Sequence, residues 1–299
     1  MARSTPKLLR RLLGTYCVTK GRRFRLSSID PDDTGGLRSE FKSEAPQLLA
    51  DGVRRLTDQQ ERLYAQDRWG VLLIFQAMDA AGKDSSIKHV LSGINPQGVQ
   101  VHSFKKPSDE EVDHDFLWRC SRALPERGHI GIFNRSYYEE VLVVRVHEDM
   151  LARQRLPESL AGNHLWRDRF QDIRAYERYL ARNGFLILKF FLHVSKQEQK
   201  KRFLARLDTP EKHWKFSAAD VEERRHWNAY AAAYEAAIRH TAAPHAPWYV
   251  VPADNKWFTS LVVSAAIVDA MERLALHFPR TSPARRRELA AARRALMRE

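Results

Sequence analysis

The sequence predicts a doubly wound α/β fold, in which a largely parallel sheet lies between helices. Two observations indicate it: five short apolar runs interrupt the chain, and segments with helical periodicity separate them. The apolar runs are 71–77, 99–104, 129–134, 185–194 and 248–253. The first and fourth are almost continuously hydrophobic, as strands are when helices cover both faces of a parallel sheet. The alternation of strand and helix favours right-handed crossover connections.

Helices are expected between and around these strands. Between the strands, apolar residues repeat at helical spacing over 83–92, 109–124, 136–147, 163–182 and 195–206. Charged amphipathic helices are predicted over 46–68 and 256–277, outside the strand region. Residues 1–40 are poorly periodic and contain Pro31, Gly35 and Gly36, so we expect an extended arm there.

The chain divides into three parts by composition. Pro279 and Pro283 separate the helix over 256–277 from a stretch with six arginines between residues 285 and 298. We therefore expect an N-terminal arm over 1–40, a core domain over 41–278 and a basic helical tail over 279–299, with the tail helix exposed to solvent.

Charge gives the first indication of a partner. Lys and Arg total 50 against 37 Asp and Glu, a formal net charge of +13. Such an excess indicates a polyanion: nucleic acid, anionic lipid or a phosphate-rich substrate. Because six of the positive charges lie between residues 285 and 298, charge alone does not select among these partners.

Other classes are excluded or disfavoured. No apolar run approaches the roughly 20 residues that cross a bilayer, so no membrane partner is expected. Cys17 and Cys120 are far apart, which excludes a disulfide framework and suits a reducing compartment. The basic N-terminus has neither a continuous apolar stretch nor a small-residue cleavage site. We therefore expect a cytoplasmic protein.

The segment from Ala77 to Ser85 joins the first strand to its helix and is similar to a Walker A loop. Gly82 lets the backbone approach a phosphate, and the N–H groups at a helix N-terminus bind anions. Lys83 can reach an oxygen of a transferred phosphoryl group. Two positions depart from the GxxxxGK[ST] pattern: Ala77 replaces the first glycine, and Asp84 stands where Ser or Thr would bind magnesium. Ser85 can supply the missing hydroxyl or cap the helix.

A carboxylate, Asp79, lies inside this loop. It would repel phosphate unless a metal or a proton intervenes. A turn residue is one interpretation, since Asp is common in turns. We favour a magnesium ligand or a group that orients the acceptor phosphate, because Asn or Ser could make the turn without that repulsion.

Polar residues also follow the strand over 129–134, at the edge where doubly wound sheets bind ligands. Asn134 occupies the place of the Walker B aspartate and can coordinate a metal through its carbonyl, but it brings no charge. Glu139, on the next helix, can supply the negative charge instead. Arg135 can bind phosphate oxygens in a bidentate manner, and Arg145 can reach an acceptor phosphate.

A basic segment follows the fourth strand and its helix. Arg202 and Arg206 are four residues apart and share a helix face, and Lys215 continues the positive charge. A solvated helix face is the alternative interpretation. Nucleotide kinases carry an arginine-bearing lid at this place, which closes over phosphates and excludes water. We expect a helical lid over about 205–225.

Four segments together resemble the family-2 polyphosphate kinases. They are AMDAAGKDSSIKHVLSGINPQG (77–98), FNRSYYEEVLVVRVH (133–147), RFLARLDTPEKHWKFS (202–217) and APWYVVPADNKW (246–257). The resemblance runs from about residue 30 to about residue 276. It implies a thymidylate-kinase-like P-loop core, a three-layer α/β/α fold with a five-stranded parallel sheet and a helical lid.

The resemblance also implies an activity. Members of this family transfer phosphoryl groups reversibly between inorganic polyphosphate and a nucleotide, with Mg²⁺ or, as an alternative, Mn²⁺. The FNRS and MDAAGKD forms resemble the branch that accepts nucleoside mono- and diphosphates, here AMP and ADP or GMP and GDP. The partners expected are therefore polyphosphate and a purine nucleotide, and the helical flanks offer surfaces for a homodimer or homotetramer.

The motifs and the resemblance together give candidate site residues. The catalytic candidates are Asp79, Lys83 and Arg135. The candidates for phosphate and polyphosphate binding are Ala80, Ala81, Gly82, Lys83, Asp84, Ser85, Lys88, Arg135, Arg202, Arg206 and Lys215. The nucleotide-binding candidates are Asn95, Pro96, Gln97, Gly98 and Arg145, and the metal ligands are Asp79, Asn134 and Glu139.

Two rival functions remain open at this point. An ATP-dependent nucleoside monophosphate kinase would share the fold and the loop. A basic nucleic-acid-binding P-loop protein would share the charge, but the sequence lacks an aromatic and basic stacking motif of the RNP type, so nucleic acid is not the expected partner.

Overall fold

The computed structural model describes residues 7–37 and 41–299. Residues 1–6 and 38–40, which belong to the predicted N-terminal arm, lie outside the described residues. The boundary predicted between arm and core falls at that second gap.

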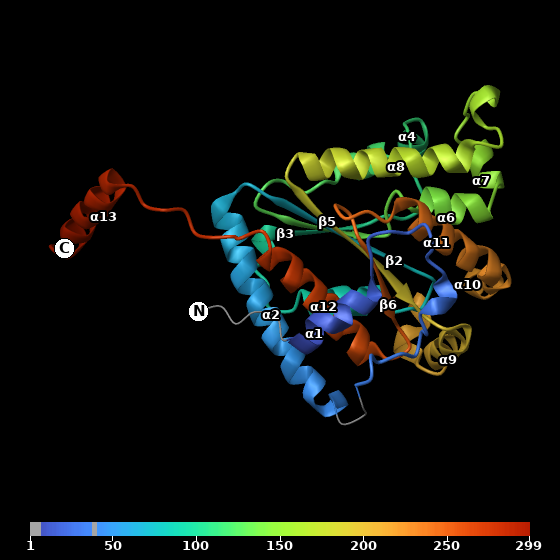
Figure 1. Cartoon of the computed structure of the whole chain (residues 1–299), viewed down its shortest axis with the longest axis horizontal. Coiled ribbons are helices and arrows are strands. Elements are labelled where there is room, and N and C mark those ends of the chain that lie inside the picture. The colour runs from blue at the N-terminus through green and yellow to red at the C-terminus, as the bar shows by residue number, and fades with distance from the viewer. Residues whose placement is uncertain (1–6, 38–40) are drawn as a thin grey trace.

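The sheet has six strands (Figure 1). They are β1 (Cys17–Val18), β2 (Gly70–Ala77), β3 (Val99–Ser103), β4 (Ile130–Asn134), β5 (Phe185–His193) and β6 (Trp248–Pro252). Their order across the sheet is β1–β6–β5–β2–β4–β3, and β2 to β6 run parallel. The predicted α/β class and its five parallel strands are confirmed, and the short β1 adds a sixth strand antiparallel to β6.

Helices cover both faces of the sheet, which makes the three layers. The α-helices are α1 (Lys7–Tyr16), α2 (Phe41–Gln66), α3 (Lys83–Val90), α4 (Asp109–Val112), α5 (Trp118–Arg122), α6 (Glu139–Val146), α7 (Asp149–Ala152), α8 (Leu165–Arg182), α9 (Lys196–Leu207), α10 (Ala218–Glu223), α11 (Trp227–Thr241), α12 (Lys256–Glu272) and α13 (Pro283–Leu296). Short 3₁₀ helices are η1 (Leu26–Ser28), η2 (Pro96–Gly98), η3 (Glu158–Leu160), η4 (Pro210–Lys215) and η5 (Arg224–His226). On one face α12 packs against α1, α2 and α3, and on the other α11 packs against α6 and α8.

The central strand β2 determines where the loops of the site meet. All eight of its residues are buried, because it pairs with β4 on one side and β5 on the other. Phe75 near its end pairs with both Asn134 and Phe190. The loops that follow β2 and β4 therefore meet at the carboxyl edge of the sheet, at the switch point where such folds bind ligands.

The N-terminal segment is folded onto the core, which corrects the expectation of an extended arm. Leu12, Leu13 and Tyr16 of α1 are buried, and β1 pairs with β6. The Tyr16 hydroxyl donates to an oxygen of Asp33 over 2.7 Å. Proline and glycine in this segment make turns between packed pieces rather than an unpaired chain.

The helix α12 corrects a second expectation, that of an amphipathic helix. Every residue from Phe258 to Met271 is buried, because α1, α2 and α3 cover the side that faces away from the sheet. Apolar residues on all sides are typical of a core helix. The outer side of α12 therefore has to be covered, and α1 of the N-terminal segment contributes to that cover.

The predicted helix over 109–124 is divided in two. Ser108 and Glu111 form a capping box at the start of α4. Asp115 then accepts a hydrogen bond from the N–H of Leu117 over 2.9 Å, which makes a turn before α5.

The basic tail forms the predicted helix. Every residue of α13 is exposed, and an extended connection holds it away from the body (Figure 1). Over the described ranges, none of the helices has both the length and the apolar character needed to span a membrane.

A fully buried ion pair joins β5 to α8. Lys189 and Glu177 are each 0% exposed, and Nζ lies 2.6 Å from Oε2. Glu177 also accepts hydrogen bonds from the hydroxyls of Tyr137 (3.0 Å) and Tyr138 (2.8 Å). Lys189 donates further to the Tyr138 hydroxyl and to the carbonyl of Thr241, both over 3.0 Å. Burial lowers the pKa of Lys189 and raises that of Glu177, and each partner opposes the shift in the other.

Removing one partner of this pair should destabilise the fold strongly. We expect Lys189→Met to lower the free energy of unfolding by about 3–5 kcal/mol, because it leaves a buried carboxylate without its cation. The double variant Lys189→Met/Glu177→Gln should recover part of the loss, since the amide oxygen still accepts from the tyrosines. Urea unfolding measures the free energy of unfolding of the single and double variants. A double variant that loses as much stability as the sum of the two single variants would contradict this account.

The same variant has a predicted pH dependence. Without Lys189, the pKa of Glu177 in the folded state lies above its unfolded value, because burial raises it and the opposing cation is gone. The folded state then binds the proton more tightly, so the variant should regain stability as the pH falls and lose it as the pH rises through the folded pKa. Urea unfolding at pH 5.5 and pH 8 compares the two, and a loss independent of pH would contradict the assignment.

Candidate active site at the carboxyl edge of the sheet

The connection from β2 to α3 forms the base of the site. Ala80 (φ +58°) and Gly82 (φ +104°) both have left-handed backbone conformations. Gly82 adopts its conformation at little cost because it has no Cβ. The N–H of Ser86 donates to the carbonyl of Gly82 over 2.9 Å, so the amides of the first turn of α3 have no helical carbonyl as partner and can bind an anion.

Lys83 is folded back over this loop. Its Nζ donates to the carbonyl of Ala77 over 3.1 Å. Burial lowers the pKa of Lys83, while Asp79 raises it. The lysine is therefore a partly desolvated cation at the entrance of the loop, next to the amides of α3.

Arg135 lies directly beside the loop, after β4. Its N–H donates to the carbonyl of Phe75 on β2 over 3.0 Å, and its φ is +66°. Its guanidinium lies between two carboxylates, 3.5 Å from Asp79 Oδ1 and 3.5 Å from Glu139 Oε2. A non-glycine residue in this conformation is strained, and such strain concentrates at functional sites. The predicted catalytic trio of Asp79, Lys83 and Arg135 is thus brought together.

The formal charges of the site's acidic and basic side chains do not cancel. Asp79, Asp84 and Glu139 carry three negative charges against two positive charges on Lys83 and Arg135. Burial raises the pKa of Glu139, whereas Arg135 and Lys83 lower it. A phosphate chain would add negative charge here, so its binding favours an additional cation.

The predicted metal ligands fit a hard divalent cation. Asp79 and Glu139 supply carboxylate oxygens, and Asn134 donates its Nδ2 to Asp84 over 2.8 Å, which leaves its carbonyl oxygen as a donor to metal. The described residues contain no group of three His, Cys, Asp or Glu side chains that could hold a metal. One or two protein carboxylates are enough for a cation that takes its other ligands from substrate phosphates and water.

The predicted lid is helical, as expected. It consists of η4, α10 and η5, and Arg206, at the end of α9, is half-buried beneath it. Glu223 of α10 accepts a hydrogen bond from the Tyr230 hydroxyl over 2.9 Å and lies 3.0 Å from His147 Nε2, which attaches the lid to α11 and α6. The side chain of Lys215 lies outside the described side chains.

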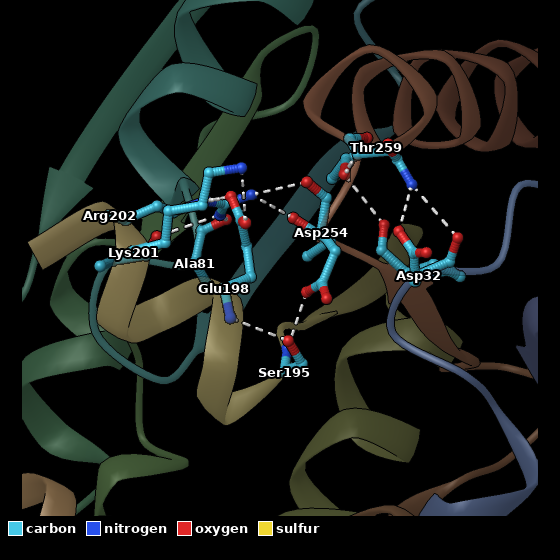
Figure 2. A network of polar contacts seen from close by, with 12 residues as sticks. Asp32, Ala81, Ser195, Glu198, Lys201, Arg202, Asp254 and Thr259 are labelled. Carbon is cyan, nitrogen blue, oxygen red and sulfur yellow. Dashed lines mark hydrogen bonds and ion pairs between the residues drawn. The ribbon is translucent and has the colours of Figure 1, made fainter. Parts of the chain in front are cut away.

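Arg202 is not placed as expected for a residue of a phosphate channel. It is only 9% exposed, and its Nε donates to Glu198 over 2.9 Å. Its remaining partners are main-chain carbonyls, those of Ala80 (3.1 Å), Ala81 (2.8 Å), Ala253 (2.6 Å) and Asp254 (3.0 Å). Figure 2 shows the side chain lying between Ala81 and Asp254. The guanidinium is committed to the protein, which corrects the expectation.

The predicted nucleotide-binding segment 95–98 lies away from the site, a second correction. It precedes β3, so it sits at the amino edge of a parallel sheet, whereas Arg135 follows β4 at the carboxyl edge. Asn95 Oδ1 accepts from the N–H of Gln97 over 3.0 Å, as a turn residue does. A Cβ on Gly98 would come within 1.9 Å of the Gln60 side chain, so this glycine serves the packing of α2.

Three further candidates are neither joined to the site nor excluded from it. Arg145 lies on α6 with its guanidinium 6.0 Å from the Trp166 ring centre and 5.8 Å from that of Phe170. Its Nη1 is buried and has no hydrogen-bond partner in the described part of the chain. Lys88 is exposed on α3, and Ser85 is half-exposed in the first turn of that helix. Their binding roles stay predictions.

Sequence reasoning missed two residues of the site. Gln199 donates from Nε2 to the carbonyl of Asp79 over 2.9 Å. It lies three positions before Arg202, so the same helix-face argument could have found it. Asp220, in the lid, is close enough to the site that Asp79 raises its pKa in addition to burial, while Arg206 lowers it. No local pattern marked Asp220.

Comparisons with known proteins show which proteins this chain is similar to. The family model described as "Polyphosphate kinase 2 (PPK2)" matches residues 40–278. The ADP-polyphosphate phosphotransferase of Rhodopseudomonas palustris is 57% identical over 259 residues, 86% of this chain and 90% of that protein. The AMP/ADP-polyphosphate phosphotransferase of Meiothermus ruber is 46% identical over 90% of this chain and 96% of its own length.

A solved structure extends the similarity to the fold. The crystal structure of polyphosphate kinase 2 from Arthrobacter aurescens is 38% identical and superposes with a TM-score of 0.84, covering 97% of this chain and 99% of that one.

The loop geometry predicts a phosphate-binding role for Lys83 that can be measured without turnover. Lys83→Ala should weaken the binding of tripolyphosphate by about 10–100-fold, because one charge-assisted hydrogen bond is lost. Lys200→Ala, which removes an exposed lysine on α9, is the matched control and should bind as the wild type does. Titration calorimetry compares them, and equal affinities for all three proteins would exclude Lys83 from the site.

Proposed function

We propose, from the premise that this chain belongs to the polyphosphate kinase 2 family, that it transfers the terminal phosphoryl group of inorganic polyphosphate to AMP and ADP. The chain is a polyphosphate–nucleotide phosphotransferase. The printed names of two relatives, one for ADP and one for AMP and ADP, support these two acceptors. GMP and GDP are the other purine nucleotides that we expect, and the reaction is reversible.

One observation carries the proposal. Lys83 and Arg135 converge with two carboxylates, Asp79 and Glu139, beside a loop whose amides can bind phosphate. Two cations and a helix N-terminus can bind a phosphate chain, and the carboxylates can hold the metal that a phosphoryl transfer requires.

The transfer is an in-line displacement. A terminal oxygen of the nucleotide's last phosphate attacks the end phosphorus of the chain. The bond from that phosphorus to the bridging oxygen breaks, and the leaving group is a polyphosphate one unit shorter. Lys83 and Arg135 offset the charge that develops on the equatorial oxygens. No covalent enzyme intermediate is required.

The metal and the lid complete this proposal. Asp79, Asn134 and Glu139 would hold Mg²⁺, with Mn²⁺ as the alternative, and the bound ion would neutralise phosphate oxygens. Arg206 and Lys215 of the lid close over the chain and exclude water, which would otherwise hydrolyse it. Ala80 and Gly82 contribute main-chain amides, whereas the N–H of Ala81 donates to the carbonyl of Met78, which corrects the expectation for Ala81.

We propose a cytoplasmic enzyme that assembles as a homodimer or homotetramer. The exposed helix α13 is one surface available for assembly.

Omission of ATP tests the donor directly. We expect AMP with polyphosphate and Mg²⁺ to yield ADP and then ATP, and ADP to yield ATP, when no other phosphoryl donor is present. Chromatography or ³¹P NMR measures the products, and chelation of the metal is the control that should stop the reaction.

Failure of this assay would favour the rivals. If product forms only when ATP is added, the protein is an ATP-dependent nucleoside monophosphate kinase. If no nucleotide turns over and the protein retains DNA or RNA tightly in a salt-dependent manner, it is a nucleic-acid-binding protein.

A further inference from the structure

Arg202 has a role that its basic character does not suggest. We propose that Arg202 is a positioning residue, which holds the carbonyls of the phosphate loop so that the loop's N–H groups face the phosphates. It also ties that loop to the end of β6 (Figure 2). The proposal rests on the proposed function only for the identity of the ligand, since the contacts concern the protein itself.

Three consecutive carbonyls of the loop are bound by one helix. Gln199 of α9 donates to Asp79, and Arg202 of the same helix donates to Ala80 and Ala81. Because all three acceptors point toward α9, the orientation of the three peptide units between residues 79 and 82 is fixed from that side.

Fixing the carbonyls fixes the amides as well. In a trans peptide the C=O and the N–H point in opposite directions, so the N–H groups of Ala80, Ala81 and Gly82 turn away from α9. The N–H of Ala81 closes a turn on the carbonyl of Met78 over 3.3 Å. The left-handed conformations at Ala80 and Gly82 belong to this arrangement, and the helix-side hydrogen bonds offset the strain at Ala80.

The guanidinium has no donor to spare for a phosphate. Arginine carries five N–H groups, and five acceptors surround them: Glu198 and the carbonyls of Ala80, Ala81, Ala253 and Asp254. Glu198 also balances the charge. A phosphate ligand at Arg202 would have to displace carbonyls that are buried and would then lack a partner.

We call Arg202, together with the carbonyls of Ala80, Ala81, Ala253 and Asp254 to which it donates, the clamp. The contacts of the clamp extend beyond the phosphate loop. Asp254 accepts from the N–H of Ser195 over 2.8 Å and donates its own N–H to the carbonyl of Pro31 over 3.1 Å. Asn255 donates from Nδ2 to Asp32 Oδ1 over 2.7 Å. Figure 2 shows Ser195, Asp254 and Asp32 of this set. The N-terminal segment thereby supports the β6 side of the clamp, and Arg202 transmits that support to the phosphate loop.

Substitution of Arg202 by lysine distinguishes the shape of the guanidinium from its positive charge. A lysine keeps the positive charge, but its single ammonium group has three donors and no planar fork, so it cannot reach carbonyls on two sides. Arg202→Lys should therefore lose most of the function, with kcat lower by about 100-fold, as expected for a misplacement of about 1 Å.

The test compares Arg202 with Arg206, one helical turn further along α9. For full-length Arg202→Lys, Arg202→Gln and Arg206→Gln we compare kcat and make two further measurements. Hydrogen exchange of the loop over 78–85 reports the clamp without any ligand. The affinity for long-chain polyphosphate at several salt concentrations reports how many cations contact the chain, at about 0.7 of slope per contact, by analogy with single-stranded nucleic acid.

We expect both Arg202 variants to raise hydrogen exchange over 78–85 while keeping the wild-type salt slope. Arg206→Gln should lower the salt slope and leave the exchange of the loop unchanged. The proposal is overturned if Arg202→Lys keeps wild-type exchange and wild-type kcat, or if Arg202→Gln lowers the salt slope as Arg206→Gln does.

Two further arms keep the outcome decisive. If the Arg202 variants do not fold, Glu198→Gln removes only the carboxylate partner and should raise exchange over 78–85 to a smaller extent, while unchanged exchange would overturn the clamp. If the wild type does not bind polyphosphate, the proposed function fails. The exchange measurement still decides the clamp in that case.

Discussion

The buried charge of Lys189 is the constraint on which the arrangement of the site depends. A lysine inside a parallel sheet is tolerable only if every donor finds an acceptor and the charge finds a counter-ion. Those partners are Glu177 on α8, Thr241 at the end of α11 and the hydroxyl of Tyr138. Tyr138 is three residues after Arg135, so satisfying the lysine holds the segment that carries the arginine against two helices. The interior polar network thus holds the backbone that carries Arg135, one of the predicted catalytic residues.

Two independent sets of contacts hold the backbone at the carboxyl edge of the sheet. The Lys189 network holds the segment after β4, and the side chains of α9 hold the loop after β2. Between them, Ala80 and Arg135 have left-handed backbones that neither residue prefers, and Arg135 lies between two carboxylates that it partly neutralises. This is preorganisation in the physical sense: the dipoles and charges are oriented before the substrate arrives, so little reorganisation is needed during transfer.

The sequence predicted what depends on local pattern and failed where long-range contacts decide. The parallel strands followed from apolar runs such as 185–194, and the loop followed from Gly82 and Lys83 next to a buried strand. The segment 95–98 was misplaced because it precedes β3. It therefore lies at the amino edge of the sheet, whereas the loops of the site follow β2 and β4 at the carboxyl edge. Arg202 was misassigned because a basic residue looks the same in the sequence whether it meets phosphate or five acceptors of the protein itself. The arm over 1–40 was misread because α12, which it covers, was not recognised as a core helix.

The most direct test of this account is a crystal structure of the enzyme with Mg²⁺, ADP and a non-transferable polyphosphate analogue. The account predicts phosphates on the amides of residues 80–85, with Lys83 and Arg135 on their oxygens and Arg202 still bound to the carbonyls of Ala80 and Ala81. Phosphates bound at the amino edge of the sheet, or an Arg202 guanidinium turned onto the phosphate chain, would contradict it.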